Sequence, residues 1–460
     1  MEKVTISENN NIGNLTTVTK CRVIATHILN RYDRSDSYID KLLESELRSN
    51  DLNRKDKALL TQLVNGTIRW RAKLDWVLIG FFHGEFHKSM NIVKNAMRIA
   101  LYQILFMEKI PEHAAINESV ELVKQIQGQK AASLVNGVLR NIVRNKQNIR
   151  FPDENEDRIF YLSIVHSHPK WMTKRWVNFW GEDFAVKLME ANNRIPYLAM
   201  RVNKLKSNAE EVENLLNKSE IKFEKSIFHP DTYKVKNLGN SITMTELYKR
   251  GLIAVQDPSA SLAAELTNAK PGMKVIDLCA APGGKSFKIA EMMENKGKLV
   301  SNDKYWGKLK ILSSEAERLG ISIIEQQKED ASECNAEEKA DVVIIDAPCS
   351  GSGTFSKKPD IKWKREIEDV YKLNTIQKDI LKNAPNLIKE NGAIVYSTCS
   401  IEPEENMGII EWFLNKFPEF TIDPAENYLP KEVCKDGFMQ TFPNVHHTDG
   451  AFAARLIRKK

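Results

Sequence analysis

Two cysteines carry the clearest chemical signal in this chain of 460 residues. Cys349 lies in the segment DAPCSGSG and Cys399 lies in STCSIEPEEN, each directly after a short apolar run. A thiolate can form a transient covalent bond with a substrate if nearby basic groups, such as Lys285, lower the thiol pKa from about 8.5. A lone cysteine is more often a buried packing residue. Two cysteines in such similar settings favour nucleophilic catalysis.

A turn of small residues at 279–285, CAAPGGK, precedes both cysteines and is typical of a ligand-binding loop. Glycine lets the backbone approach a ligand closely, and a helix start presents free amide groups. The ending GKS also matches the last part of a Walker A loop, but Cys279 stands where that loop needs its first glycine. The fingerprint GxGxxG is absent too. The turn therefore indicates a neutral or weakly charged cofactor, and a P-loop nucleotide hydrolase acting on RNA stays the alternative.

Three acidic residues, Asp303, Asp330 and Asp346, follow later apolar runs. A carboxylate after the second strand of a doubly wound sheet can accept hydrogen bonds from both ribose hydroxyls, and an acid after the third can accept from an adenine amino group. Taken singly, each is more often a helix cap or a solvated loop residue. Together with the glycine turn they predict a site for a nucleoside cofactor.

These residues must be positioned by strands that alternate with helical segments. The predicted strands are Val275–Cys279, Leu299–Asp303, Val342–Asp346 and Ala393–Thr398. Such alternation predicts an α/β fold with a mostly parallel sheet and helices on both faces. Ligands of these sheets bind at the carboxyl ends of the strands. The cysteines, the turn and the acids should therefore share one edge.

The chain divides into three predicted domains. Residues 1–150 read as all-α, residues 151–250 as a small mixed α/β connecting module, and residues 251–460 as the α/β catalytic domain. Within the first, Ala96–Met107 is apolar nearly all round, and Ser133–Arg144 is amphipathic with a basic outer face that includes Arg140 and Arg144. Residues 1–150 hold 23 Lys and Arg against 15 Asp and Glu, which suggests contact with phosphates or else a solvated basic face.

Composition excludes several classes of protein. The six cysteines form no CxxC pair and no zinc-like Cys/His spacing, so we expect no metal and a reducing, cytoplasmic setting. Apolar runs such as Trp76–Phe82 reach only seven residues, so we expect no membrane partner.

The segments CAAPGGKS, DAPCSGSG, KKPDIKW, STCSIEPEEN and DGAFAARLIRK, with RVN at 201–203, resemble the RNA 5-methylcytosine methyltransferases of the Sun/Fmu/RsmB type. The helical front, including LNRKDKALLTQLVNGTIRW and ASLVNGVLRNIVR, resembles the RNA-binding domain of the antitermination factor NusB. The resemblance implies a Rossmann-like catalytic domain and S-adenosylmethionine as cofactor. It implies Cys399 as nucleophile and Cys349 as helper in product release. Asp346, if protonated or sharing a proton with N3 of the base, would neutralise the charge that develops on the ring. The resemblance assigns the cofactor contacts to Cys279, Ala280, Ala281, Pro282, Gly283, Gly284, Lys285, Asp303, Asp330 and Asp346.

The implied reaction is methylation of C5 of a cytosine in small-subunit (16S) ribosomal RNA, through a covalent bond from the cysteine to C6. Free ribosomal RNA, rather than the fully assembled subunit, is the expected partner. The alternatives are a tRNA substrate and an RNA-binding assembly factor without catalytic activity. The chain departs from the family at Phe355-Ser356-Lys357-Lys358, where lysines replace the usual arginines, so a bidentate phosphate contact would become a point-charge contact.

Overall fold

The computed structural model describes residues 18–235 and 241–459, and the chain forms two compact units. The first unit extends to Asn193 and also contains Lys358–Lys364. The second unit contains Arg194–Lys357 and the chain from Arg365 onward. Residues 1–17 of the predicted helical domain and residues 236–240 of the predicted connecting module lie outside the described residues.

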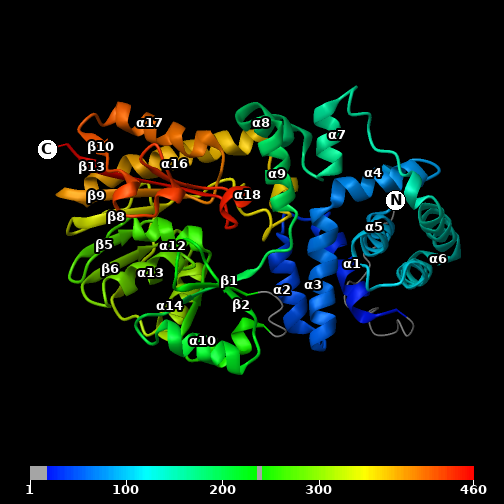
Figure 1. The fold of residues 1–460 in the computed structure, drawn as a ribbon, viewed down its shortest axis with the longest axis horizontal. Helices are drawn as coiled ribbons and strands as arrows, with labels where there is room; N and C mark the ends of the chain where they lie inside the picture. Colours follow the sequence, from blue (N-terminus) through cyan, green and yellow to red (C-terminus); the bar gives the residue numbers. More distant parts are fainter. Residues whose placement is uncertain (1–17, 236–240, 460) are drawn as a thin grey trace, which may run out of the picture. The chain divides into compact units, whose positions relative to one another are not determined.

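The described part of the first unit is entirely helical, as predicted for the front of the chain (Figure 1). Twelve of the sixteen residues of α5 are buried, which confirms the prediction of a central helix. Helix α3 packs closely on it, because a Cβ at Gly66 would lie 2.0 Å from the Tyr102 ring. The helices are α1 Lys20–Tyr32, α2 Ile39–Ser49, α3 Arg54–Arg69, α4 Arg71–Phe81, η1 Phe86–Lys88, α5 Asn91–Phe106, α6 Glu112–Arg144, η2 Lys146–Asn148, α7 Arg158–Val165, α8 Lys170–Trp180, α9 Glu182–Asn192 and α15 Ile361–Lys364.

The predicted amphipathic helix forms the last part of α6, after a break at Gly128 with φ of 81°. Its buried face is made by Val135, Val138, Leu139 and Ile142, while Arg140 and Arg144 are exposed. Leu134 differs from the prediction, since it is 38% exposed. It lies three and seven positions before the exposed residues Gly137 and Asn141, and this spacing places it on the solvent side of the helix.

The segment Lys358–Lys364 belongs to the helical unit, although it lies within the range of the predicted catalytic domain. Asp360 accepts a hydrogen bond from the backbone amide of Ile39 at 2.9 Å, and Trp363 donates its indole N–H to the Ile68 carbonyl at 2.8 Å. Lys362 is buried and donates to the Arg69 carbonyl at 3.0 Å, and burial lowers its pKa well below the usual range. Helical contacts therefore hold a segment that follows Cys349 closely in sequence.

The second unit begins with a small antiparallel sheet of order β2-β3-β1-β4. The predicted succession of strand, helix and strand after residue 197 is confirmed by β1, α10 and β2. The elements are β1 Leu198–Val202, α10 Ala209–Lys218, β2 Phe223–Lys225, β3 Thr232–Val235, η3 Ile242–Met244, α11 Glu246–Lys249 and β4 Ile253–Val255.

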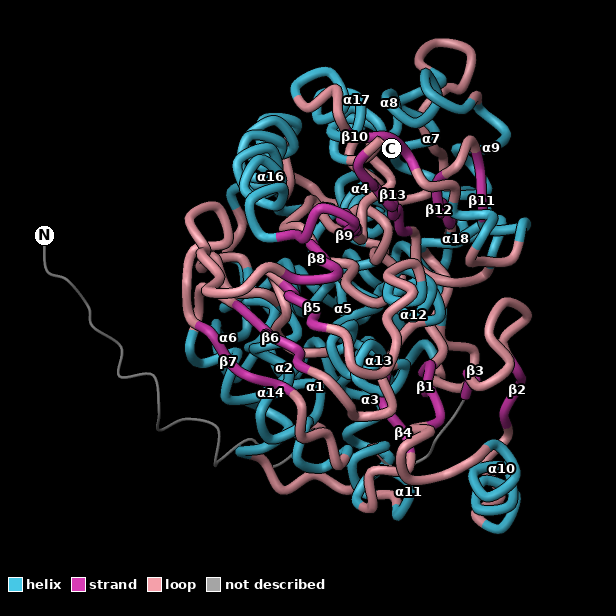
Figure 2. Tube along the Cα trace, turned by 90° about the vertical axis from the view of Figure 1, so that its left-hand side faces the viewer, coloured by secondary structure: helices cyan, strands magenta, loops and turns pink. Residues whose placement is uncertain are grey.

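The large sheet has nine strands in the order β11-β12-β13-β9-β8-β5-β6-β7, with β10 paired to β13. The run from β9 to β7 is parallel and contains the four predicted strands, while β10 to β13 are antiparallel additions that the sequence analysis did not anticipate (Figure 2). The strands are β5 Lys274–Asp277, β6 Lys298–Asn302, β7 Ile324–Gln327, β8 Ala340–Asp346, β9 Ile388–Thr398, β10 Phe420–Ile422, β11 Cys434–Lys435, β12 Phe438–Thr441 and β13 Ala451–Arg458. The helices are α12 Pro258–Glu265, α13 Gly284–Met292, α14 Trp306–Leu319, α16 Ile367–Leu387, η4 Pro403–Glu405, α17 Met407–Lys416, η5 Ala425–Asn427, η6 Lys431–Val433 and α18 Pro443–His446.

Alternate residues of the parallel strands enter two different cores, as the two-residue period of a strand requires. Val275 and Val342 pack with the helices α12, α13 and α14 on one face. Their neighbours Ile276 and Val343 pack with α16 and α17 on the other face (Figure 1). Burial on both faces explains why these strands read as nearly continuous apolar runs.

Candidate active site

The glycine turn connects the end of β5 to the start of α13. Gly283 has φ of 114°, and a Cβ there would lie 2.2 Å from the Phe287 ring, so both backbone and space require glycine. The Ala280 amide donates to the Asn302 carbonyl at 2.8 Å and joins the turn to the end of β6. The turn is thereby held in one position. At its end lie the first amide groups of α13, which have no hydrogen-bond partners within the helix.

Asn302 holds the ends of three strands together. Its side-chain amide donates to the Leu278 carbonyl at 3.1 Å, and its side-chain oxygen accepts from the Glu329 amide at 2.9 Å. The residue is fully buried and pairs in register with Gln327. Asn302 thus fixes the start of the loops that carry Asp303 and Asp330.

Asp303 and Asp330 both lie at the predicted edge, and both also cap their own loops. Asp303 is 6% exposed and accepts from the Tyr305 amide at 2.9 Å. Asp330 accepts from the Ser332 amide at 3.1 Å and pairs with Lys304 at 2.8 Å. The hydrogen bond from Lys304, followed by those from Ser332, lowers the pKa of Asp330 to about 2, so this carboxyl is ionised at neutral pH.

Asp346 ends β8 and forms an ion pair with Lys285 of the glycine turn. The Lys285 Nζ lies 2.7 Å from Asp346 Oδ2, and the Ser397 hydroxyl donates to Oδ1 at 3.3 Å. Burial alone would lower the pKa of Lys285, but the charge of Asp346 and its hydrogen bond raise it above the ordinary value. The end of the glycine turn therefore carries an ammonium group beside the acid that follows β8.

The two cysteines meet because β8 and β9 are adjacent parallel strands. The Sγ atoms of Cys349 and Cys399 lie 3.2 Å apart, at hydrogen-bond distance for sulfur. This hydrogen bond, together with burial, raises the pKa of the Cys349 thiol well above its usual range. The charge of Cys399 in turn contributes to the raised pKa of Lys285. A thiol pair, a carboxylate and an ammonium group thus gather at neighbouring strand ends.

Not every residue singled out from the sequence has a free functional group. Burial raises the pKa of the Cys279 thiol well above its usual range, so its contribution to the turn comes from its backbone. Lys357 forms ion pairs with Asp257 and, at 2.9 Å, with Asp449. Lys357 is thus already bound by two carboxylates whose side chains are mostly covered, and its point-charge contact to phosphate stays a prediction.

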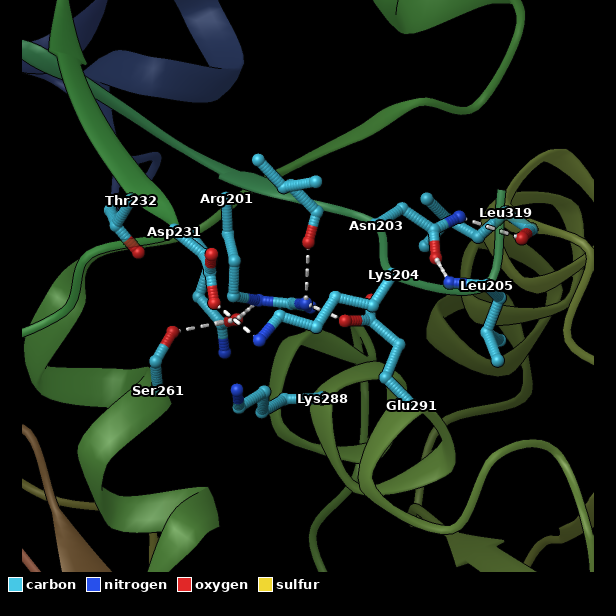
Figure 3. Close-up of polar contacts among 12 residues, drawn as sticks. Arg201, Asn203, Lys204, Leu205, Asp231, Thr232, Ser261, Lys288, Glu291 and Leu319 are labelled. Carbon is cyan, nitrogen blue, oxygen red and sulfur yellow. Dashed lines mark hydrogen bonds and ion pairs between the residues drawn. The ribbon is translucent and has the colours of Figure 1, made fainter. Parts of the chain in front are cut away.

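Arg201 and Gln256 support the glycine turn, although the sequence analysis gave neither a role. Arg201 is buried and pairs with Glu291 of α13 (Figure 3). It also donates from Nε to Gln256 at 2.8 Å. Gln256 in turn donates to the Gly284 carbonyl at 2.9 Å. The RVN segment is the signal that could have pointed to this support. Its Asn203 donates to the Gly251 and Leu319 carbonyls, each at 2.8 Å, and thereby holds the small sheet on α14.

Asp277, the last residue of β5, was also missed. Its side chain is fully buried, and Oδ2 accepts from the Ser286 hydroxyl at 2.7 Å while Oδ1 has no partner. Burial raises its pKa to about 7. A carboxyl group beneath the glycine turn is therefore close to half-protonated at neutral pH.

This raised pKa gives a testable dependence of stability on pH. Between about pH 4, where an unfolded aspartate ionises, and about pH 7, the folded protein holds one more proton than the unfolded chain. Stability should therefore fall as pH rises, at no more than about 1.4 kcal/mol per pH unit from this group. We expect this pH dependence to be absent in Asp277→Asn. Between pH 5 and 7, the free energy of unfolding of the wild type, measured in urea, should fall by about 2 kcal/mol more than that of the variant. Identical pH profiles would contradict the raised pKa.

The described residues include no cluster of three His, Cys, Asp or Glu side chains arranged to hold a metal ion. No helix within the described ranges has both the length and the apolar character that a membrane span requires.

Comparison with known proteins gives a consistent result over most of the chain. Residues 264–457 match the family model "16S rRNA methyltransferase RsmB/F", residues 19–144 match the NusB family, and residues 168–240 match the ferredoxin-like domain of RsmF/B-like methyltransferases. The chain is 37% identical to the probable ribosomal RNA small subunit methyltransferase B of Bacillus subtilis, over 96% of this chain and 99% of that one.

Two further similarities support the same assignment. The ribosomal RNA small subunit methyltransferase B of Klebsiella pneumoniae is 32% identical over 88% of this chain and 91% of its own length. The crystal structure of PH0851 matches 95% of this chain and 99% of that chain, with a TM-score of 0.80 and 26% identity. These matches favour a methyltransferase over the P-loop alternative. The chain belongs to the RsmB/F family of 16S ribosomal RNA methyltransferases, with a NusB domain in front of its methyltransferase domain.

Proposed function

We propose that this protein transfers a methyl group from S-adenosylmethionine to C5 of a cytosine in small-subunit ribosomal RNA, with Cys399 as nucleophile. The observation that carries the proposal is the cysteine pair, whose Sγ atoms lie 3.2 Å apart at the ends of β8 and β9. A methyltransferase that attacked with a nucleophilic base nitrogen would need no thiol. A carbon such as cytosine C5 does need one, because it is a poor nucleophile until a thiolate adds at C6.

The strand ends fit S-adenosylmethionine as cofactor. The start of α13 offers backbone amides, and the buried carboxylate of Asp303 follows β6 where ribose hydroxyls bind in doubly wound folds. The assigned contacts are Cys279, Ala280, Ala281, Pro282, Gly283, Gly284 and Lys285, with Asp303, Asp330 and Asp346. When bound, this cofactor supplies an electrophilic methyl group on sulfur.

The residues of the chain prepare the base for this methyl group. Cys399 forms a bond from Sγ to C6, which breaks the ring's 5,6 double bond and makes C5 electron-rich. The proton that the Cys399 thiol loses passes to Asp346, which shares it with N3 of the base and neutralises the negative charge that develops on the ring. Lys285, an ammonium group 2.7 Å from Asp346, places a positive charge beside this carboxyl group.

Product release requires two bonds to break. A base, for which Cys349 is the candidate, takes the proton from the methylated C5, the 5,6 double bond forms again, and the bond from C6 to Cys399 Sγ breaks so that Cys399 leaves as a thiolate. Cys349 lies beside Cys399 and assists this elimination. The base must leave any helical stack to reach the cysteines, so an unpaired cytosine is the expected target, and ribosomal RNA as substrate places the enzyme in the cytoplasm.

The basic outer face of α6 is the proposed contact for RNA phosphates. Arg140 and Arg144 are exposed and lie one helical turn apart. Each phosphate neutralised contributes about 0.7–0.9 to the slope of log affinity against log salt concentration. We expect Arg140→Gln with Arg144→Gln to flatten the slope for ribosomal RNA by about 1.5, as measured by filter binding. An unchanged slope would mean that the basic face of α6 is only solvated and does not contact phosphates. The control is Lys389→Gln, which removes an exposed charge from the second unit.

Methyl incorporation into purified RNA tests the substrate. Labelled S-adenosylmethionine should transfer its methyl group to naked small-subunit ribosomal RNA more efficiently than to assembled subunits, whose proteins cover much of the RNA. Preferential labelling of total tRNA in the same salt would overturn the choice of RNA and leave the C5 chemistry standing.

A further inference from the structure

A buried carboxylate lies beside the cysteine pair and has no role in the reaction proposed above. Glu405, in the segment STCSIEPEEN, is fully buried at the end of η4. It accepts hydrogen bonds from the Ser350 amide at 2.8 Å, the Ser350 hydroxyl at 2.5 Å and the Gln377 side-chain amide at 3.1 Å. No Lys or Arg among the described residues forms an ion pair with it. Burying a charge without a counter-ion costs free energy, so the three hydrogen-bond donors must stabilise the ionised carboxylate.

These donors are all tied to the loop of Cys349, because Ser350 is the next residue and Gln377 of α16 also donates to the Pro348 carbonyl at 2.9 Å. Glu405 therefore contacts Ser350, the residue after Cys349, directly. It is linked to Pro348, the residue before Cys349, through Gln377. The backbone on both sides of the thiol is fixed to one carboxylate.

A chain of serine hydroxyls continues from Glu405 to the loop of Cys399. The Ser350 and Ser400 oxygens lie 3.1 Å apart, and so do those of Ser400 and Ser352. An ionised carboxylate only accepts, so Ser350 must donate to Glu405, Ser400 to Ser350, and Ser352 to Ser400. The Gly353 amide also donates to the Cys399 carbonyl at 3.0 Å. The loops that carry the two thiols are thus joined by hydrogen bonds whose direction the carboxylate sets.

We infer that Glu405 is a positioning residue, which holds Cys349 against Cys399 through Ser350 and thereby sets the rate of product release. The inference rests on the proposed roles of the two cysteines. The charge of Glu405 is also one cause of the raised pKa of Cys349, after the hydrogen bond with Cys399, burial and the charge of Cys399, and before the charge of Asp346. Removing the charge of Glu405 should therefore lower the pH at which the rate of RNA release changes. A residue with a purely structural role would not produce this shift.

The test compares Glu405→Ala, Glu405→Gln and Ser350→Ala in the full-length protein with small-subunit ribosomal RNA and S-adenosylmethionine. Glutamine can still accept from the Ser350 amide through Oε1, so it should preserve the loop, while it removes the charge and puts a donor in place of the oxygen that accepts from the Ser350 hydroxyl. We expect Glu405→Ala and Ser350→Ala to slow multiple turnover about tenfold or more, because a hydrogen bond to a charged group is worth about that factor. A ribonuclease-sensitive protein–RNA band should accumulate, while cofactor affinity stays within about twofold. Glu405→Gln should turn over faster than Glu405→Ala, with its pH profile for release shifted downward.

Two comparisons make the result decisive. Glu411→Gln removes a negative charge from the exposed side of α17 and should behave as wild type. Cys349→Ala should give the band independently of Glu405. If Cys349→Ala gives the band but Ser350→Ala and Glu405→Gln release RNA like wild type, at the same pH, the role of Glu405 is wrong. If Cys349→Ala gives no band either, the proposed roles of the cysteines fail as well. Ser350→Ala removes one hydroxyl only, so it keeps the test available if Glu405→Ala does not fold.

Discussion

Cys399→Ala should reduce methyl transfer to ribosomal RNA by at least about a thousandfold, which corresponds to roughly 4 kcal/mol of lost transition-state stabilisation. Without a thiolate at C6, the ring is not activated and C5 attacks the methyl group directly. The cofactor site should be unaffected, because Cys399 follows β9 whereas the glycine turn follows β5. Affinity for S-adenosylmethionine, measured by calorimetry, should therefore stay within about twofold of wild type.

A matched substitution separates the nucleophile from a general need for thiols. Cys434 begins β11, which is three strands away from β9 in the order of the sheet, and Cys434→Ala should retain wild-type turnover. Substantial turnover by purified Cys399→Ala would remove this residue from the reaction. Equal losses in both variants would indicate loss of folding instead.

Cys349→Ala should leave the enzyme attached to its RNA. If Cys349 assists elimination, its removal lets the bond between Cys399 and C6 form but slows its cleavage. Methyl transfer should continue to about one equivalent per enzyme, and multiple turnover should fall about a hundredfold, or about 3 kcal/mol in the barrier to release. A denaturing gel should show a slowly migrating protein band that ribonuclease removes.

The double variant Cys349→Ala with Cys399→Ala should lose that band, since no thiol remains to form the bond. A band that persists in the double variant would place the attachment at another residue. Normal RNA binding by Cys349→Ala with no band and unchanged turnover would make Cys349 a packing residue.

The sequence predicted the parallel core of the sheet because its strands are buried on both faces. The predicted strand Val342–Asp346, for example, lies within β8, at Ala340–Asp346. The antiparallel strands β10 to β13 were not predicted. Three of them have only two to four residues, too few for a periodic signal, and β13 pairs along β9 to complete the sheet. The place of Lys358–Lys364 in the helical unit was equally hidden, since it depends on contacts such as that of Asp360 with Ile39, 321 positions away.

The candidate site was predictable where it depends on strand ends. Parallel strands end at one edge, so the approach of Cys349 to Cys399 follows from the order of β8 and β9. Their catalytic roles remain predictions. The supporting residues could not be recognised, because Asp277 and Glu405 are ordinary acids until burial and partners are known. An aspartate inside the apolar run VIDL and a glutamate within the second cysteine motif were the only signals.

Mapping of 5-methylcytosine at single-nucleotide resolution tests the central proposal most directly. Bisulfite sequencing would be applied to total RNA from cells that contain this protein, lack it, or carry only Cys399→Ala. The proposed function predicts one cytosine of small-subunit ribosomal RNA that resists bisulfite conversion in the first cells and is converted in the other two. The same small-subunit pattern in all three, or a difference confined to tRNA, would contradict it.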